Sequence, residues 1–329
     1  MKLVTLVAKD RTYHVGLLLE SKTPGSNRTE NRIVDLHELN PGPTTSHMLE
    51  FIKDQKKTLP WAQSILEKAN AGQLDEKVIH AESECLIASP IPEPVSCRDG
   101  YAFRQHVESA RRRRGLPMLP EFDEFPVFYF TNHLAITGPG DLFIMPKALE
   151  RFDFELEVAI VIGKEGRNIK AADADEHIFG YMIMNDWSAR ELQTQEMKMN
   201  LGPAKGKDFA TSLGPYLVTR DSLASHRIAG ANGEKFDLRM KAFHNGKQVS
   251  DGNLKDMNWS FGQIIERASY GVTLRPGEVI GSGTVGTGCY MELNLTKVTD
   301  NVWIKPGDDF VLEVDELGRL ENKIHAANS

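Results

Sequence analysis

A run of alternating side chains between residues 152 and 162 constrains the fold of this chain more than any other feature. Successive side chains of a β-strand point to opposite faces, so every second residue of a strand shares one face. In this run the members of one face are all apolar: Phe154, Leu156, Val158, Ile160 and Ile162. The alternation predicts a β-strand with at least one buried face.

Other segments indicate that the rest of the chain is also rich in strands. Residues 2–7 and 12–20 read as paired strands, and the tail from Gly277 to Leu317 reads as strands punctuated by glycine. The pair Asn245-Gly246 supplies the positive φ angles of a hairpin turn. Strands with few helices predict a mixed, β-rich α+β fold with antiparallel pairing, and not a doubly wound sheet.

In the alternating run between residues 152 and 162, the face opposite the apolar one carries two carboxylates, Glu155 and Glu157. They lie two residues apart, so they project to the same side. A solvated face of an edge strand is one explanation. The face continues with Ala159 and Val161, which favours burial. Two neighbouring carboxylates in a partly buried place need a cation or a proton.

A third acid, Asp186, follows an apolar run and precedes a predicted helix. That position is typical of a helix N-cap. Arg190 and Gln193 follow four and seven residues later, so they would stack on one helical face with Asp186. Capping and ligand binding are compatible, and both interpretations stay open.

Residues 99–114 are predicted to form a helix that ends in four arginines. Asp99 and His106 are seven residues apart, which is close to two helical turns, so their side chains would align. A lone histidine is more often structural than catalytic, but a neighbouring carboxylate keeps both roles open. The arginines from Arg111 to Arg114 read as a solvated helix end, with a lid or an anion site as alternatives.

Carboxylate oxygens without clustered histidines or cysteines would make an all-oxygen metal site. Such a site suits Mg²⁺, Ca²⁺ or Mn²⁺ and does not suit a structural zinc ion. Spacing alone leaves open whether the acids meet. The candidate ligands are Asp99, Glu155, Glu157 and Asp186.

The chain divides at a proline-rich passage, residues 89–94. Before it, two short helices are expected over residues 48–53 and 60–71. We therefore predict a small N-terminal α/β module over residues 1–90 and a catalytic domain over residues 91–329.

Composition excludes several classes of protein. The formal net charge of -7 argues against a nucleic-acid-binding or anionic-membrane surface. The apolar stretches are too short for a membrane span. The three cysteines form no C-x-x-C pair, so neither a zinc knuckle nor a disulfide framework is expected. A cytoplasmic protein without nucleic-acid or membrane partners is predicted.

From Asp99 to about Leu293 the chain resembles the fumarylacetoacetate hydrolase superfamily. The N-terminal module is similar to that of the longer members. Five segments in the family's order carry the resemblance: DGYAFRQH from Asp99, ELE from Glu155, NDWSAR from Asn185, GKDF from Gly206 and GSGT from Gly281. The resemblance implies a mixed β-sandwich roll whose active site lies near a homodimer interface.

The resemblance also implies roles for individual residues. Asp99, Glu155, Glu157 and Asp186 would hold Mg²⁺ or Ca²⁺, with Mn²⁺ as a further candidate. His106 would be the general base, Glu292 would orient it, and Lys207 would complete the catalytic group. The substrate-binding positions would be Tyr101, Arg114, Tyr129, Arg190, Gln193 and Thr284.

Arg114 is included because Gly115 stands near the place of the family's substrate-binding arginine, and Arg114 is the nearest replacement. Tyr129 resembles a substrate-binding tyrosine of the long enzymes, so it favours the fumarylacetoacetase branch over the short acylpyruvases.

The implied activity is metal-dependent hydrolysis of a carbon–carbon bond in a small dicarbonyl acid. His106, held by Glu292, would deprotonate the attacking water, and Lys207 would help to stabilise the oxyanion. Alternatives that use the same site are oxaloacetate decarboxylation, acylpyruvate hydrolysis and 2-oxo acid isomerisation. A noncatalytic, metal-stabilised binding protein is the alternative from another class.

Overall fold

The computed structural model describes residues 1–22, 29–113 and 115–328. Within these residues the largest sheet is mixed. Its main path runs β4 (Ile79–Ala81), β3 (Thr29–Asp35), β2 (Tyr13–Lys22), β1 (Lys2–Val7), β15 (Thr211–Thr219), β13 (Ile178–Asp186), β11 (Leu156–Ile162), β21 (Glu278–Gly281), β6 (Ser96–Gly100) and β7 (Phe128–Thr131). Two short strands lie off this path: β5 (Ile87–Ala88) pairs with β1, and β8 (Ile136–Thr137) pairs with β15.

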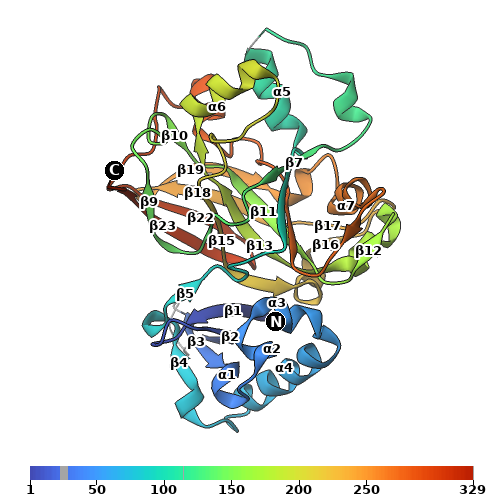
Figure 1. Ribbon diagram of the computed structural model, residues 1–329, viewed down its shortest axis with the longest axis vertical. Helices are drawn as coiled ribbons and strands as arrows, with labels where there is room; N and C mark the ends of the chain where they lie inside the picture. Colours follow the sequence, from blue (N-terminus) through green and yellow to red (C-terminus); the bar gives the residue numbers. More distant parts are fainter. Residues whose placement is uncertain (23–28, 114, 329) are drawn as a thin grey trace.

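A second sheet packs against the first (Figure 1). Its strands follow the order β19 (Lys247–Asn253), β18 (Arg239–His244), β22 (Asp309–Val314), β23 (Gly318–Ala326) and β9 (Gly140–Ile144). Short ribbons pair β10 (Phe152–Asp153) with β14 (Ser188–Ala189), β12 (Gly166–Arg167) with β20 (Thr273–Leu274), and β16 (Arg227–Ile228) with β17 (Lys235–Phe236). The predicted β-rich α+β class is confirmed, although β6–β21, β8–β15 and β9–β23 are parallel pairs.

β11 explains why the alternating run is so apolar. It lies between β13 and β21, so the edge-strand explanation is wrong. Val158 and Ile160 face the core that the two sheets share. Ala159 and Val161 face a second core, which the N-terminal helices cover. Both faces of the strand are buried, and the carboxylates on it are therefore buried as well.

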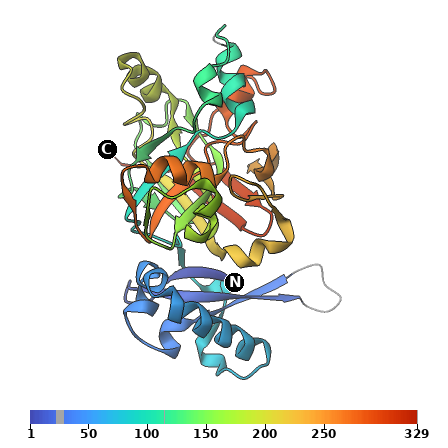
Figure 2. The same ribbon diagram turned by 90° about the vertical axis from the view of Figure 1, so that its right-hand side faces the viewer.

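The N-terminal residues form the lower lobe in Figures 1 and 2. Helices α1 (Leu36–Leu39), α2 (Pro43–Ser46), α3 (Met48–Lys53) and α4 (Gln55–Asn70) pack on β1 to β3. α4 begins before the predicted start at Pro60, which lies inside the helix. β1 pairs with β15, so the large sheet continues through this lobe. The division at residue 90 stays a prediction.

The remaining helices are α5 (Arg104–Arg113), α6 (Arg190–Glu196), α7 (Phe261–Ser269) and α8 (Tyr290–Leu295). Three expectations from the sequence are corrected in this part of the chain. Asp99 lies on β6 and not on a helix, because β6 pairs with strands on both sides. Asp186 ends β13, and Ala189 occupies the N-cap of α6. The predicted strand-only tail contains α8.

Short 3-10 turns connect several of these elements: η1 (Glu76–Val78), η2 (Glu82–Glu84), η3 (Pro120–Asp123), η4 (Ala171–His177), η5 (Met197–Met199), η6 (Arg220–His226) and η7 (Leu254–Asp256). None of the helices in the described part of the chain is long and apolar enough to cross a membrane.

Candidate active site and metal centre

Four buried carboxylates meet where neighbouring strands of the large sheet end. Asp99 lies on β6, Glu157 on β11, Asp186 at the end of β13, and Glu155 immediately before β11. One oxygen from each residue lies within 4.8 Å of the others. The structure therefore brings together the four acids that the sequence proposed as ligands.

The GSGT segment after β21 supports two of these carboxylates. The Gly283 amide donates to Asp99 Oδ1 at 3.2 Å and to Glu157 Oε2 at 3.0 Å. The Thr284 hydroxyl donates to Glu157 Oε1 at 3.3 Å. A Cβ atom on Gly281 would lie 2.5 Å from Asp99 Oδ1, so only glycine leaves room for the carboxylates there.

The carboxylate cluster has more negative charge than its neighbours neutralise. Burial, and then the nearby Asp186 carboxylate, raise the pKa of Asp99 to about 7. Burial and the Asp99 carboxylate raise the pKa of Glu157 well above its ordinary value. Burial also raises the pKa of Asp186, although Lys207 opposes it. Among the described residues, Asp186 Oδ1 is buried without a hydrogen-bond partner.

These observations fit a hard divalent cation. Its charge would replace the protons that buried carboxylates otherwise retain, and oxygen donors suit Mg²⁺, Ca²⁺ and Mn²⁺. Gly281 leaves room for two of the donor oxygens, because a Cβ there would lie 2.5 Å from Asp99 Oδ1 and 3.1 Å from Glu157 Oε2. The residues that would hold the ion are Asp99, Glu155, Glu157 and Asp186.

Lys207 lies at the edge of the carboxylate cluster. Its Nζ donates to Asp186 Oδ2 at 2.6 Å and also contacts Glu155 Oε2. Burial alone would raise the pKa of Glu155, but the charges of Lys207 and Arg190 lower it to about 2. Tyr129 donates its hydroxyl to Asp186 Oδ2 at 2.5 Å. Glu155 therefore remains ionised, whereas burial favours the protonated forms of the other three acids of the cluster.

His106 and Glu292 form a buried pair on one wall. The His106 Nδ1 atom lies 2.8 Å from Glu292 Oε2. His106 comes from α5 and Glu292 from α8, and both side chains are buried. Glu292 occupies Nδ1, so Nε2 is the ring nitrogen left for a substrate or water. The Tyr101 ring stands edge-on to the imidazole, with ring centroids 5.8 Å apart.

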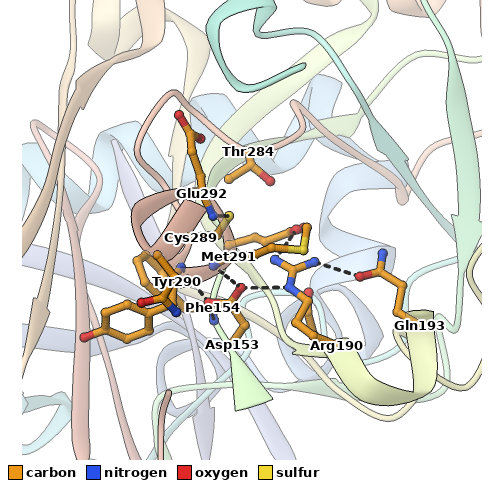
Figure 3. A network of polar contacts seen from close by, with 12 residues as sticks. Asp153, Phe154, Arg190, Gln193, Thr284, Cys289, Tyr290, Met291 and Glu292 are labelled. Carbon is orange, nitrogen blue, oxygen red and sulfur yellow. Dashed lines mark hydrogen bonds and ion pairs between the residues drawn. The ribbon is translucent and has the colours of Figure 1, made fainter. Parts of the chain in front are cut away.

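A second polar network lies behind this wall, with Asp153 at its centre (Figure 3). Arg190 Nε donates to Asp153 Oδ2 at 2.7 Å. Its Nη2 donates to Glu155 Oε1 at 2.8 Å, and its Nη1 donates to Gln193 Oε1 at 3.0 Å. The predicted stacking of Arg190 and Gln193 is thus a direct contact within α6, without Asp186.

These groups surround a cavity of about 730 Å³. The predicted site residues that line it are Asp99, Tyr101, His106, Tyr129, Glu155, Arg190, Gln193, Lys207 and Thr284. Glu157, Asp186 and Glu292 lie in the layer behind the lining. Arg114 lies outside the described residues, whereas Arg111 and Lys198 line the cavity.

The sequence interpretation missed Asp153. The signal was present, because Asp153, Glu155 and Glu157 follow one another at the two-residue spacing of a strand face. Arg111 was read as part of a solvated helix end, and the folded structure places it on the cavity wall.

Comparison with known proteins decides the family. A family model described as fumarylacetoacetate (FAA) hydrolase C-terminal matches residues 96–325. The chain belongs to this family. The resemblance seen in the sequence is confirmed, and the protein is an enzyme of the fumarylacetoacetate hydrolase superfamily.

Two curated relatives of this family member are oxaloacetate tautomerases. YisK of Bacillus subtilis is 29% identical over 98% of this chain and 100% of its own length. Bovine mitochondrial FAHD2A is 31% identical over 89% of this chain and 83% of its own length.

Solved structures agree with the fold. Fumarylacetoacetate hydrolase from Exiguobacterium antarcticum superposes with a TM-score of 0.70 at 24% identity, covering 99% of this chain and 100% of that one. Maleylpyruvate hydrolase from Sphingobium sp. SYK-6 gives 0.68 at 19% identity, with coverage of 99% and 100%.

Proposed function

We propose that the chain is a divalent-metal-dependent oxaloacetate tautomerase, which interconverts the enol and keto forms of this 2-oxo acid. The observation that carries the proposal is a single cavity that joins four clustered carboxylates to a buried His106–Glu292 pair. The full-length similarity to the tautomerase YisK supports the choice of reaction. The proposal replaces hydrolysis as the leading activity with the isomerase alternative.

Tautomerisation moves one proton between C3 and the oxygen on C2, so it needs a base and a stabilised oxygen. In the keto-to-enol direction His106 would remove a proton from C3 and then, as the imidazolium, give a proton to the oxygen on C2, directly or through a water molecule. The reverse direction retraces these steps, and Glu292 would hold the imidazole in place. A divalent ion bound by the four carboxylates would supply Lewis-acid polarisation of the 2-oxo group.

Lys207 suits a role as a fixed cation. Burial would lower the pKa of Lys207, but the neighbouring Asp186 and Glu155 carboxylates raise it above its ordinary value. A lysine that keeps its proton stabilises negative charge on the substrate oxygen and does not act as the base.

The cavity also suits a dianionic substrate. Arg111 and Lys198 also line it, and these two cations would contact the second carboxylate of oxaloacetate. The predicted small dicarbonyl acid substrate is retained, and oxaloacetate is the member that we propose.

Hydrolysis of a carbon–carbon bond is the second candidate. A cavity of about 730 Å³ falls within the usual size range of ligand pockets, so a larger acylpyruvate and a water molecule would fit. In that reaction His106 would deprotonate water instead of C3.

The decisive experiment follows loss of enol absorbance after oxaloacetate is dissolved, and cleavage of an acylpyruvate in parallel. Both assays use wild type and His106→Asn, with Mg²⁺ and with EDTA, against enzyme-free blanks. Tautomerisation that requires metal and His106 supports the proposal. Acylpyruvate cleavage without tautomerisation would favour the hydrolase, and inactivity in both assays of folded, metal-loaded protein would overturn both.

The predicted homodimer concerns assembly and not chemistry. It stays a prediction, and light scattering of the purified protein would measure it.

A further inference from the structure

Asp153 is a fully buried carboxylate that the proposed reaction does not use directly. Its Oδ1 accepts from the backbone amides of Phe154 at 2.9 Å and Tyr290 at 2.7 Å. Its Oδ2 accepts from Arg190 Nε at 2.7 Å and from the Met291 amide at 2.9 Å. Figure 3 shows Asp153 at the meeting point of these contacts.

The contacts join two separate parts of the cavity wall. Tyr290 and Met291 are the first two residues of α8, and the next residue is Glu292, the partner of His106. Arg190 begins α6 and directs its other nitrogens toward Glu155 and Gln193. One side chain therefore holds both the start of α8 and the guanidinium.

We propose that Asp153 is a positioning residue: it fixes the His106–Glu292 pair and the Arg190 guanidinium relative to each other in the cavity wall. The inference rests on the proposed function for its kinetic consequences, but its structural claim is independent of the reaction. Asp153 touches neither the cavity nor the reacting atoms, so it acts through Glu292 and Arg190.

The contacts of Asp153 suit a side chain that accepts hydrogen bonds on both of its oxygens. Four N–H groups point at the two oxygens, and a carboxylate accepts without donating. An asparagine would turn two donors of its own against two of those groups. A glutamate would keep the charge beside Arg190 but move it by one methylene.

A double-mutant cycle between Asp153→Asn and Glu292→Gln tests the proposal. Disruption of an orienting partner typically costs about 10- to 100-fold in activity, and we expect a loss of kcat in that range for D153N. The part of this loss that passes through Glu292 should disappear in the E292Q background. D153N should therefore cost at least about 3-fold less there than in the wild type, and the remaining loss is the part that passes through Arg190.

Glu234→Gln is the matched control. Glu234 is buried and accepts from Arg220 Nε and Nη2, and its ion-pair partners among the described residues, Arg220 and Arg227, do not line the cavity. We expect E234Q to leave kcat within about 2-fold of wild type and to show no coupling with E292Q. Asp153→Glu, which keeps the buried charge, enters the same cycle in case D153N does not fold.

Equal losses from D153N in the wild-type and E292Q backgrounds would overturn the proposal, because they indicate a general loss of structure. If the wild type catalyses neither candidate reaction, a crystal structure of D153N or D153E becomes the test. A His106 Nδ1–Glu292 Oε2 distance unchanged from 2.8 Å, with Arg190 in place, would then overturn it independently of the function.

Discussion

Asp153 and the carboxylate cluster lie close together in the core, but they differ in how many hydrogen-bond donors and positive charges surround them. Asp153 meets four N–H donors, and Arg190 supplies a positive charge. The carboxylate cluster around Asp99 and Glu157 receives few donors, and burial raises the pKa of both acids. Burial is common to both groups, so the number of donors separates a structural acid from a site that needs a cation.

Glu157→Gln should produce the largest effect, because it removes one of the four carboxylates that would hold the cation. We expect loss of Mg²⁺ binding by calorimetry and a fall in activity on the order of 10⁴-fold, since a bound metal contributes several kcal/mol to transition-state stabilisation. In EDTA the melting temperature should equal or exceed that of wild type, because glutamine keeps the shape of the side chain and removes a buried acid that burial and Asp99 disfavour in its charged form.

Asp153→Asn should lower the melting temperature under the same conditions. A metal-free E157Q protein that melts well below wild type would contradict this difference between the two groups, because the carboxylate cluster would then be stable without a cation.

His106→Asn should have the next largest effect. Removal of a positioned general base costs roughly 10²- to 10⁴-fold in kcat. His106 pairs with Glu292 and not with the carboxylate cluster, so Mg²⁺ affinity should match wild type. A large loss of Mg²⁺ affinity in this variant would assign His106 to the metal site and contradict its role as the base.

The stability of the metal-free protein should depend on pH through Asp99. The pKa of this carboxyl rises from 3.8 to about 7 on folding, so the folded protein holds a proton that the unfolded chain releases. The free energy of unfolding should therefore fall as pH rises from about 4 to about 7, and level off above that. Melting in EDTA between pH 5 and pH 8 measures the slope, and Asp99→Asn should flatten it. An identical slope in D99N would exclude Asp99 as the source.

Glu234→Gln should have the smallest functional effect. Glu234 is a satisfied buried acid like Asp153, and Arg220 Nη2 donates to it at 3.0 Å. Loss of this charge should lower the free energy of unfolding by about 1–3 kcal/mol in denaturant titrations. Activity should stay close to wild type because its partners lie away from the cavity, and a large loss of kcat would show that buried acids here affect catalysis without a specific contact.

Much of the fold was predictable from local patterns. The alternation after Phe152 identified β11, and the Asn245-Gly246 pair forms the predicted hairpin turn with φ angles of 49° and 78°. The spacing of Glu155 and Glu157 placed two carboxylates on one strand face. These features depend on a few consecutive residues, whose backbone preferences and side-chain directions are local.

Predictions that relied on sequence distance alone were less successful. The seven-residue interval from Asp99 to His106 indicated one helix, but pairing with β7 and β21 makes the first residue part of a strand. The supposed N-cap, Asp186, completes β13 instead. Backbone hydrogen bonds to distant strands override a local helical interpretation.

The strand, the acidic residues on its face and the family could be read from short segments of sequence, because each depends on a few consecutive residues. The convergence of the four acids depends on the three-dimensional fold, as does the contact of His106 with Glu292, 186 residues away. The fold also gives Asp153 hydrogen-bond donors for both of its oxygens, whereas Asp186 Oδ1 has none among the described residues. Whether a buried carboxylate is neutralised depends on the hydrogen-bond donors that other elements place beside it. Strand pairing and helix packing determine which donors these are.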